Sequence, residues 1–202
     1  SSPFEINWEK NELIKIMNFC KYNKITVILD EVYQLMGSNS FINNINRYDN
    51  LIILRSLSKG FGYPGIRSGY IIANLNLLKE IETFRLAIEL PYDTLNKSIK
   101  AISNFKKKTS KRVKQIVDAR NFAHKQFQIR GMKSFNFFSN SVSFLFDSKV
   151  IKNKVCKKLN KKKILLNYNY DGNLKCFANI TTTNKKNLEF FFKSLDESMK
   201  IK

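Results

Sequence analysis

A chain of 202 residues, 43% hydrophobic and 13% aromatic, can bury one sizeable core or two small ones, and it is too apolar for a disordered protein. Residues 1–95 hold 10 basic and 10 acidic side chains, whereas residues 96–202 hold 26 and 6 and so carry the whole net charge of +20. No apolar run approaches the roughly 20 residues that cross a bilayer, and the first residues lack the basic and apolar stretches of a signal peptide.

Cysteine and lysine usage bear on compartment and partners. Cys20, Cys156 and Cys176 lie far apart, without metal-ligand spacing, which indicates reduced thiols in a cytoplasmic protein and no metal site. Lysine supplies 29 of the 36 basic residues, and on charge alone a polyanion-binding patch would fit. Because the lysines fall mainly on the polar faces of predicted helices, we favour a solvated surface and expect no nucleic-acid or membrane partner.

The first part of the chain alternates helices and strands. Residues 9–22 have apolar side chains at helical spacing, and residues 25–29 form an apolar run that ends at Asp30. Such a run after a helix predicts a parallel strand buried on both faces. Residues 51–54 predict a second buried strand, and residues 68–73 predict a third strand after a glycine-rich turn. Residues 1–95 therefore read as part of a large α/β domain.

Residues 96–202 have a different order of predicted helices and strands. Residues 99–128 predict one long helix, which ends at Arg130-Gly131 with a basic last turn and a helix-ending glycine. Residues 141–146 alternate like a half-buried strand, and a closing helix carries an apolar stripe from Leu188 to Met199. Residues 96–202 are predicted to form a small α+β domain, with the boundary near residue 95.

Polar residues gather where the predicted strands end, and each has an ordinary interpretation. Asp30 could cap a turn, Tyr33 could be a core residue, and Lys59 could be a solvated loop lysine. His124, the single histidine, lies on the lysine-rich helix and is interpreted as a surface residue. The combination is more specific: D-E-V-Y begins at Asp30, and S-L-S-K ends at Lys59, 29 residues later.

These motifs resemble the class I/II aminotransferases of pyridoxal-phosphate fold type I, especially the histidinol-phosphate aminotransferase branch. The resemblance rests on D-E-V-Y, on S-L-S-K-G-F-G-Y-P-G-I-R-S-G-Y, and on P-Y-D-T-L-N at residues 91–96. It is strong over residues 1–100 and weaker to the C-terminus. It implies the C-terminal half of the large domain, a small domain, a pyridoxal 5′-phosphate cofactor and a homodimer.

The resemblance also assigns roles to individual residues. Lys59 matches the lysine that forms a Schiff base with the cofactor and then carries a proton from the substrate. Asp30 matches the buried carboxylate that keeps the pyridine nitrogen protonated, and Tyr33 matches the tyrosine on the phenolic oxygen. The family's residues that bind the cofactor phosphate are matched here by Ser56, Ser58 and Arg67.

Two departures from the family pattern limit what the resemblance implies. Ser2 stands where the family has an asparagine that touches the cofactor, and the motif around that asparagine is absent. We therefore expect the 202 residues to be a piece of a longer product and to bind cofactor poorly alone. Ala178 stands where the family has the arginine that binds the substrate carboxylate, and Lys161 to Lys163 could bind a phosphate instead.

Three functions remain open. The leading hypothesis is an aminotransferase that exchanges amine and carbonyl groups between small, possibly phosphorylated substrates. The second is a decarboxylase of a phosphorylated amino acid, which would share the cofactor residues. The third is a non-catalytic remnant that serves as a structural or interaction domain.

Overall fold

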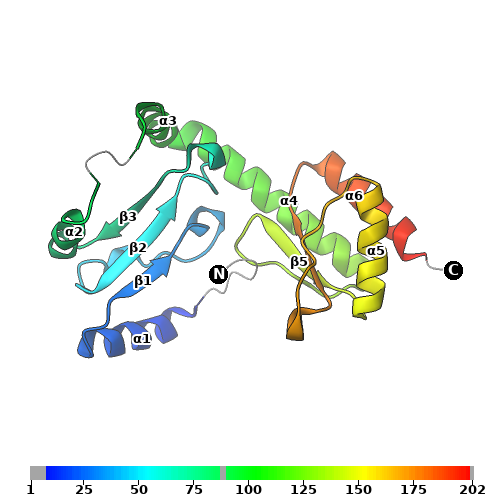
Figure 1. Cartoon of the computed structure of the whole chain (residues 1–202), viewed down its shortest axis with the longest axis horizontal. Helices are drawn as coiled ribbons and strands as arrows, with labels where there is room; N and C mark the ends of the chain where they lie inside the picture. Colours follow the sequence, from blue (N-terminus) through cyan, green and yellow to red (C-terminus); the bar gives the residue numbers. More distant parts are fainter. Residues whose placement is uncertain (1–7, 87–89, 201–202) are drawn as a thin grey trace. The chain divides into compact units, whose positions relative to one another are not determined.

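The computed structural model describes residues 8–86 and 90–200, which divide into two compact units within the chain (Figure 1). One unit ends at Val113 and the other begins at Lys114. The sequence places the boundary near residue 95, about a helix length earlier. Both units combine helices with a three-stranded sheet, as predicted for an α/β chain.

The first unit is built on a mixed sheet with the strand order β1-β2-β3. β1 and β2 run parallel, with Asp30 paired to Leu54, and β3 runs antiparallel to β2, with Gly69 paired to Ser56. The elements of this unit, in chain order, are α1 (Lys10–Tyr22), β1 (Val27–Asp30), η1 (Gln34–Met36), η2 (Ile42–Asn44), β2 (Leu51–Ser56), η3 (Pro64–Ile66), β3 (Gly69–Ala73), α2 (Leu75–Glu82), α3 (Tyr92–Ser103) and η4 (Phe105–Thr109).

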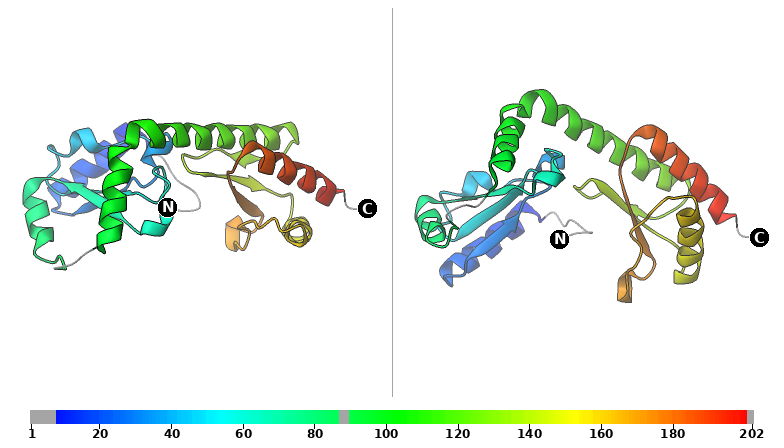
Figure 2. Two further views of the ribbon diagram at one scale, coloured as in Figure 1. Left: turned by 90° about the horizontal axis from the view of Figure 1, so that it is seen from above. Right: turned by 45° about the horizontal axis from the view of Figure 1, so that its top comes forward.

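One face of this sheet is covered by α1, which lies along the strands in Figure 2. Met17 of α1 packs with Leu51 and Ile53 of β2, and all three are fully buried. The opposite face is open: Ile28 is 59% exposed, and Ile71 of β3 is 37% exposed. The expectation that the first strand is buried on both faces is therefore wrong for the described residues.

The predicted long helix is divided in three. α3 ends at Ser103, Asn104 lies between the helices, and η4 is a short π-helical turn that leads into α4 (Ser110–Ile129). π-Helical turns are rare and occur often at functional sites. α4 ends one residue before Arg130, as predicted, and Gly131 has a φ of 68°.

The second unit is an antiparallel sheet with the strand order β4-β5-β6 beside helices (Figure 2). Its core contains Phe127 of α4, Phe144 of β5 and Phe191 of α6, all at most 2% exposed. Apolar side chains point from one sheet face toward this core. The remaining elements are β4 (Ser134–Phe135), β5 (Ser141–Leu145), α5 (Lys149–Lys161), η5 (Gly172–Leu174), β6 (Phe177–Thr181) and α6 (Lys185–Met199).

Candidate active site

The topology of the first sheet brings the predicted site residues to one edge. β1 and β2 are parallel, so the segments that follow them, with Tyr33 and Lys59, leave the sheet on the same side. β3 is antiparallel to β2, so it starts at that side, two residues after Arg67. Ligands of open α/β sheets bind at such carboxyl ends of parallel strands.

Lys59 lies in a tight turn after β2. The Gly62 amide donates to the Lys59 carbonyl at 2.9 Å, and the Tyr63 amide donates to the Leu57 carbonyl at 2.9 Å. The Lys59 Nζ lies 5.1 Å from the centre of the Tyr33 ring, within the range of a cation–π contact. The structure therefore brings together the two residues that the resemblance assigns to the cofactor's reactive end.

Asp30 and Ser56 lie on the same face of the sheet. Asp30 pairs with Leu54, and Ser56 is two residues further along β2, so both side chains project from the open face. The Asp30 carboxylate accepts a hydrogen bond of 3.0 Å from the Val32 amide, which is the turn-capping contact of its ordinary interpretation. Asp30 is exposed, whereas the sequence predicts a buried carboxylate.

The proposed phosphate ligands gather around two turns. Ser56 Oγ accepts from the Ser58 amide at 3.0 Å, and Arg67 Nη1 donates to the Pro64 carbonyl at 3.1 Å. Arg67 is exposed and has a left-handed backbone with φ 50°, a strained conformation that concentrates at functional sites. Ser2 lies outside the described residues.

Gly69 permits β3 to start close to β2. A Cβ at this position would lie 2.7 Å from the carbonyl oxygen of Arg55, a backbone atom that cannot move aside. The glycine therefore sets how closely the segment after Arg67 approaches the end of β2.

A buried ion pair beneath the site was missed by the sequence reasoning. Glu31, 8% exposed, accepts from Arg55 Nη2 at 2.9 Å, from Ser40 Oγ at 2.9 Å and from the Phe41 amide at 2.6 Å. Glu31 follows β1 and Arg55 is near the end of β2. The opposite charges of these two residues, at the ends of neighbouring predicted strands, were the sequence signal that could have predicted the ion pair. The pair fixes the two strand ends that carry Asp30 and Ser56.

A cavity of about 360 Å³ opens beside this ion pair. Its polar lining includes Glu31, Arg55 and Ser56, and its apolar lining includes Phe61 and Phe105. Asp30, Lys59 and Arg67 are not among its lining residues, so it adjoins the candidate site without containing it.

Ala178 does not occupy a ligand-facing position. It is fully buried in the core of the second unit and pairs with Phe144. The adjacent Asn179 projects from the other face of the sheet, where its Nδ2 donates to Ser143 Oγ at 2.9 Å and Ser141 Oγ at 3.2 Å. Ala178 therefore faces the core and Asn179 faces the other side of the sheet, since neighbouring strand residues face opposite ways.

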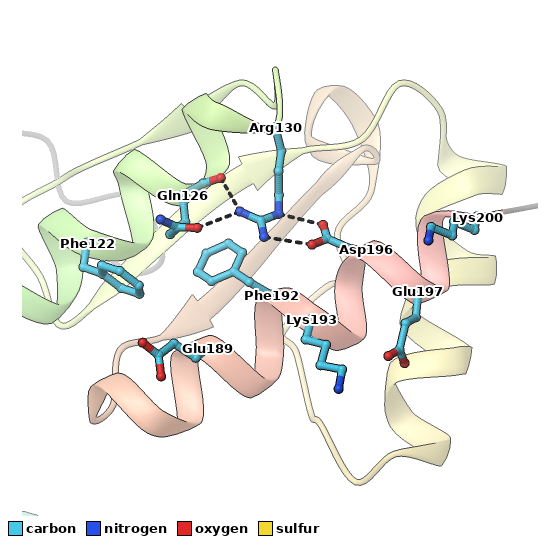
Figure 3. Close-up of a pocket in the computed structure, with 9 residues that line it drawn as sticks. All are labelled: Phe122, Gln126, Arg130, Glu189, Phe192, Lys193, Asp196, Glu197 and Lys200. Atoms are coloured by element: carbon cyan, nitrogen blue, oxygen red, sulfur yellow. Dashed lines mark hydrogen bonds and ion pairs between the residues drawn. The ribbon is translucent and has the colours of Figure 1, made fainter.

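A second cavity, of about 420 Å³, lies between α4 and α6 (Figure 3). Arg130 is at its centre and forms a bidentate pair with Asp196, at 2.6 Å and 2.8 Å. Its Nη1 donates to the carbonyl and side-chain oxygens of Gln126, and its guanidinium lies 4.7 Å from the Phe192 ring centre. These contacts make Arg130 a structural link between the end of α4 and α6.

His124 and Cys156, two further residues of reactive types, have structural contacts in the second unit. His124 Nδ1 is 2.9 Å from Ser134 Oγ, a contact that joins α4 to β4. Burial raises the pKa of the Cys156 thiol to about 11, against a smaller lowering by Lys152. Such a thiol stays protonated and unreactive at neutral pH.

Comparison with known proteins identifies the family to which this chain belongs. The family model described as aminotransferase class I and II matches residues 1–186, and the chain belongs to this family. Among solved structures, the histidinol-phosphate aminotransferase of Clostridium acetobutylicum is similar over 98% of this chain and 61% of its own, with a TM-score of 0.85 at 22% identity. That likeness shows fold type I.

The particular branch is indicated by the curated relatives. The chain is 35% identical over 127 residues to the histidinol-phosphate aminotransferase of Pyrococcus furiosus, covering 63% of this chain and 36% of the relative. It is 31% identical over 186 residues to that of Clostridium novyi, covering 89% and 49%. The chain thus resembles the histidinol-phosphate aminotransferase branch, and its matches span between about a third and half of these relatives' lengths.

Proposed function

We propose that this chain supplies the lysine and several cofactor ligands of a pyridoxal-phosphate-dependent aminotransferase. The observation that carries the proposal is the position of Lys59 over Tyr33, at the strand ends that also hold Asp30. The histidinol-phosphate aminotransferases similar to this chain support the same chemistry.

The residues at the strand ends suit this cofactor. Ser56, Ser58 and Arg67 offer hydroxyl and guanidinium donors for a phosphate dianion, and Asp30 offers a carboxylate for a protonated ring nitrogen. Asp30 and Ser56 project from the same open face of the sheet, so a flat ring with a phosphate arm could contact both residues. Because Asp30 is exposed and a carboxylate in water is a poor partner, we propose that the 202 residues alone bind the cofactor weakly.

Each side chain has a defined task in this proposal. Bound pyridoxal phosphate supplies an electron sink for negative charge at the substrate Cα. The Lys59 amine would hold the cofactor and would serve as the group that moves the proton from the substrate Cα. The Tyr33 hydroxyl donates to the phenolic oxygen, and the Asp30 carboxylate holds a proton at the ring nitrogen.

We extend the proposal to the whole protein as a cytoplasmic homodimer that acts on small amines and keto compounds, phosphorylated ones among them. The described helices include none that is both long and apolar enough to cross a membrane. The similar proteins named for a phosphorylated substrate, histidinol phosphate, support a phosphorylated amine.

A decarboxylase of a phosphorylated amino acid is the alternative. It is supported by likeness to the L-threonine-O-3-phosphate decarboxylase of Porphyromonas gingivalis, over 100% of this chain and 62% of that chain, with a TM-score of 0.79. The identity is 18%, so that likeness concerns the fold alone. The aminotransferase is favoured because its support includes sequence relatives.

Product analysis tests the proposal. The protein saturated with pyridoxal phosphate is given phosphorylated amines, phosphorylated amino acids and 2-oxoglutarate, and both carbonyl product and carbon dioxide are measured. The aminotransferase predicts a carbonyl product in equal amount to glutamate. Carbon dioxide release without glutamate would contradict it and favour the decarboxylase. A Lys59→Ala variant serves as the control for background chemistry.

A further inference from the structure

The turn that carries Lys59 is held from outside by Arg112, in the first turn of α4. Arg112 Nη1 donates to the carbonyl oxygen of Phe61, 51 residues away in sequence and two residues after Lys59. The Arg112 guanidinium also lies 5.6 Å from the centre of the Tyr63 ring. One side chain therefore contacts two residues of the turn, by a charge-assisted hydrogen bond and by a cation–π contact.

Gly62 leaves the space that this guanidinium occupies. Gly62 has a φ of 75°, and a Cβ at this position would lie 2.7 Å from Arg112 Cδ and 2.8 Å from its Cζ. Glycine is thus required both for the left-handed backbone and for the approach of Arg112. The contact between Arg112 and the turn therefore depends on glycine at position 62, since any larger residue there would displace the arginine.

Apart from Arg112, the outer half of the turn is held by apolar packing, as of Phe61 with Leu57 and Ala101, and by hydrogen bonds within the turn. Leu57 is buried, and its amide donates to the Ser68 carbonyl at 3.1 Å, which ties the start of the turn to β3. The outer half is held by the Gly62 amide on the Lys59 carbonyl and by Phe61, whose ring is 5.5 Å from that of Phe105. The Phe105 contact is apolar and non-directional, so Arg112 supplies the directional restraint from outside the turn.

We propose that Arg112 is a positioning residue for Lys59, an inference that rests on the proposed function. It acts through the Phe61 carbonyl and the Tyr63 ring to hold the Lys59 backbone so that the amine stays over Tyr33. Nothing in its contacts places it against the substrate or the cofactor. Misplacement of a reacting amine by about 1 Å is enough to slow a reaction substantially.

Three variants test this role. Arg112→Met keeps an unbranched apolar stem and removes the donors, whereas Arg112→Lys keeps a charge and one donor group. Arg47→Met is the matched control, because Arg47 stacks at 5.5 Å on Tyr48 in the same unit, outside the Lys59 turn. The readouts are the rate at which borohydride traps pyridoxal phosphate on Lys59, the pH midpoint of the bound cofactor's visible absorption, and amide hydrogen exchange of residues 57–63 without cofactor.

Arg112→Met is expected to slow trapping at Lys59 about tenfold, to shift the absorption midpoint and to speed exchange in the turn. Arg112→Lys is expected to recover part of each effect, and Arg47→Met to match wild type. Wild-type trapping and exchange in Arg112→Met would overturn this inference alone, as would equal slowing in Arg47→Met. Absence of trapping at Lys59 in wild type would overturn the proposed function and this inference together.

Discussion

The Nζ of Lys59 lies 5.1 Å from the centre of the Tyr33 ring, although 26 positions separate the two residues in the chain. The parallel pairing of β1 with β2 produces this proximity, because each residue follows the carboxyl end of its strand by three positions. A lysine above a tyrosine at such an edge is a suitable place for an amine that must bind and release a carbonyl compound.

Asp30→Asn is expected to leave the fold intact and to lower turnover by roughly 10- to 100-fold, the equivalent of a lost hydrogen bond to a charged group. The amide has nearly the same shape, and its Oδ1 can still accept from the Val32 amide. It cannot hold a proton at the ring nitrogen by charge. Single-turnover kinetics in the complete enzyme measure the effect, and wild-type rates would count against the assigned role.

Ala178→Arg is expected to destabilise the second unit by about 3 kcal/mol or more, because it places an unpaired charge in an apolar core. Thr181→Arg on the same strand is the control, since Thr181 is exposed. Urea unfolding followed by circular dichroism measures both. Equal stability of the two variants would show that position 178 does not face the core.

Cys156 should make the protein less stable at alkaline pH. Its pKa rises from 9.0 in the unfolded chain to about 11 in the fold, so the folded state binds the proton more tightly. The associated stability is present below pH 9.0 and is lost as the pH rises toward about 11. The loss is on the order of 2 kcal/mol. Cys156→Ala should show a smaller fall in unfolding free energy over this range, and an identical fall in both proteins would contradict the prediction.

The net charge of +20 is expected to give no specific nucleic-acid binding. Part of the basic surface is already neutralised in the structure, as where Lys162 pairs with Glu197 and Lys185 with Glu189. Titration against duplex and single-stranded oligonucleotides at physiological salt provides the test. Sub-micromolar affinity with a steep salt dependence would show a polyanion-binding surface.

Local patterns predicted much of the fold. The first helix, the strands β1, β2, β3 and β5, and the end of α4 follow from apolar periodicity and from Gly131, and the structure confirms them. The break in the long helix was missed because residues 99–128 keep helical periodicity through η4. The open sheet face was missed because an apolar run shows that a strand tends to be buried, without showing what covers it.

The candidate site was predictable where motifs are local. Asp30, Tyr33, Ser56, Ser58, Lys59 and Arg67 follow from two short stretches, and the topology gathers those stretches at one edge. Glu31 with Arg55 and Arg112 with Phe61 were not predicted, because each contact joins segments whose pairing depends on the tertiary fold. The burial of Ala178 was not predicted either, because a motif match does not show which face of its strand packs on the core.

Borohydride trapping of pyridoxal phosphate followed by peptide mapping tests the central claim most directly. The complete enzyme is reduced in the presence of cofactor, digested, and searched for the reduced adduct on every lysine. The account predicts the adduct on Lys59, and its absence in Lys59→Ala. An adduct spread evenly over the surface lysines, or concentrated on another lysine with none on Lys59, would contradict it.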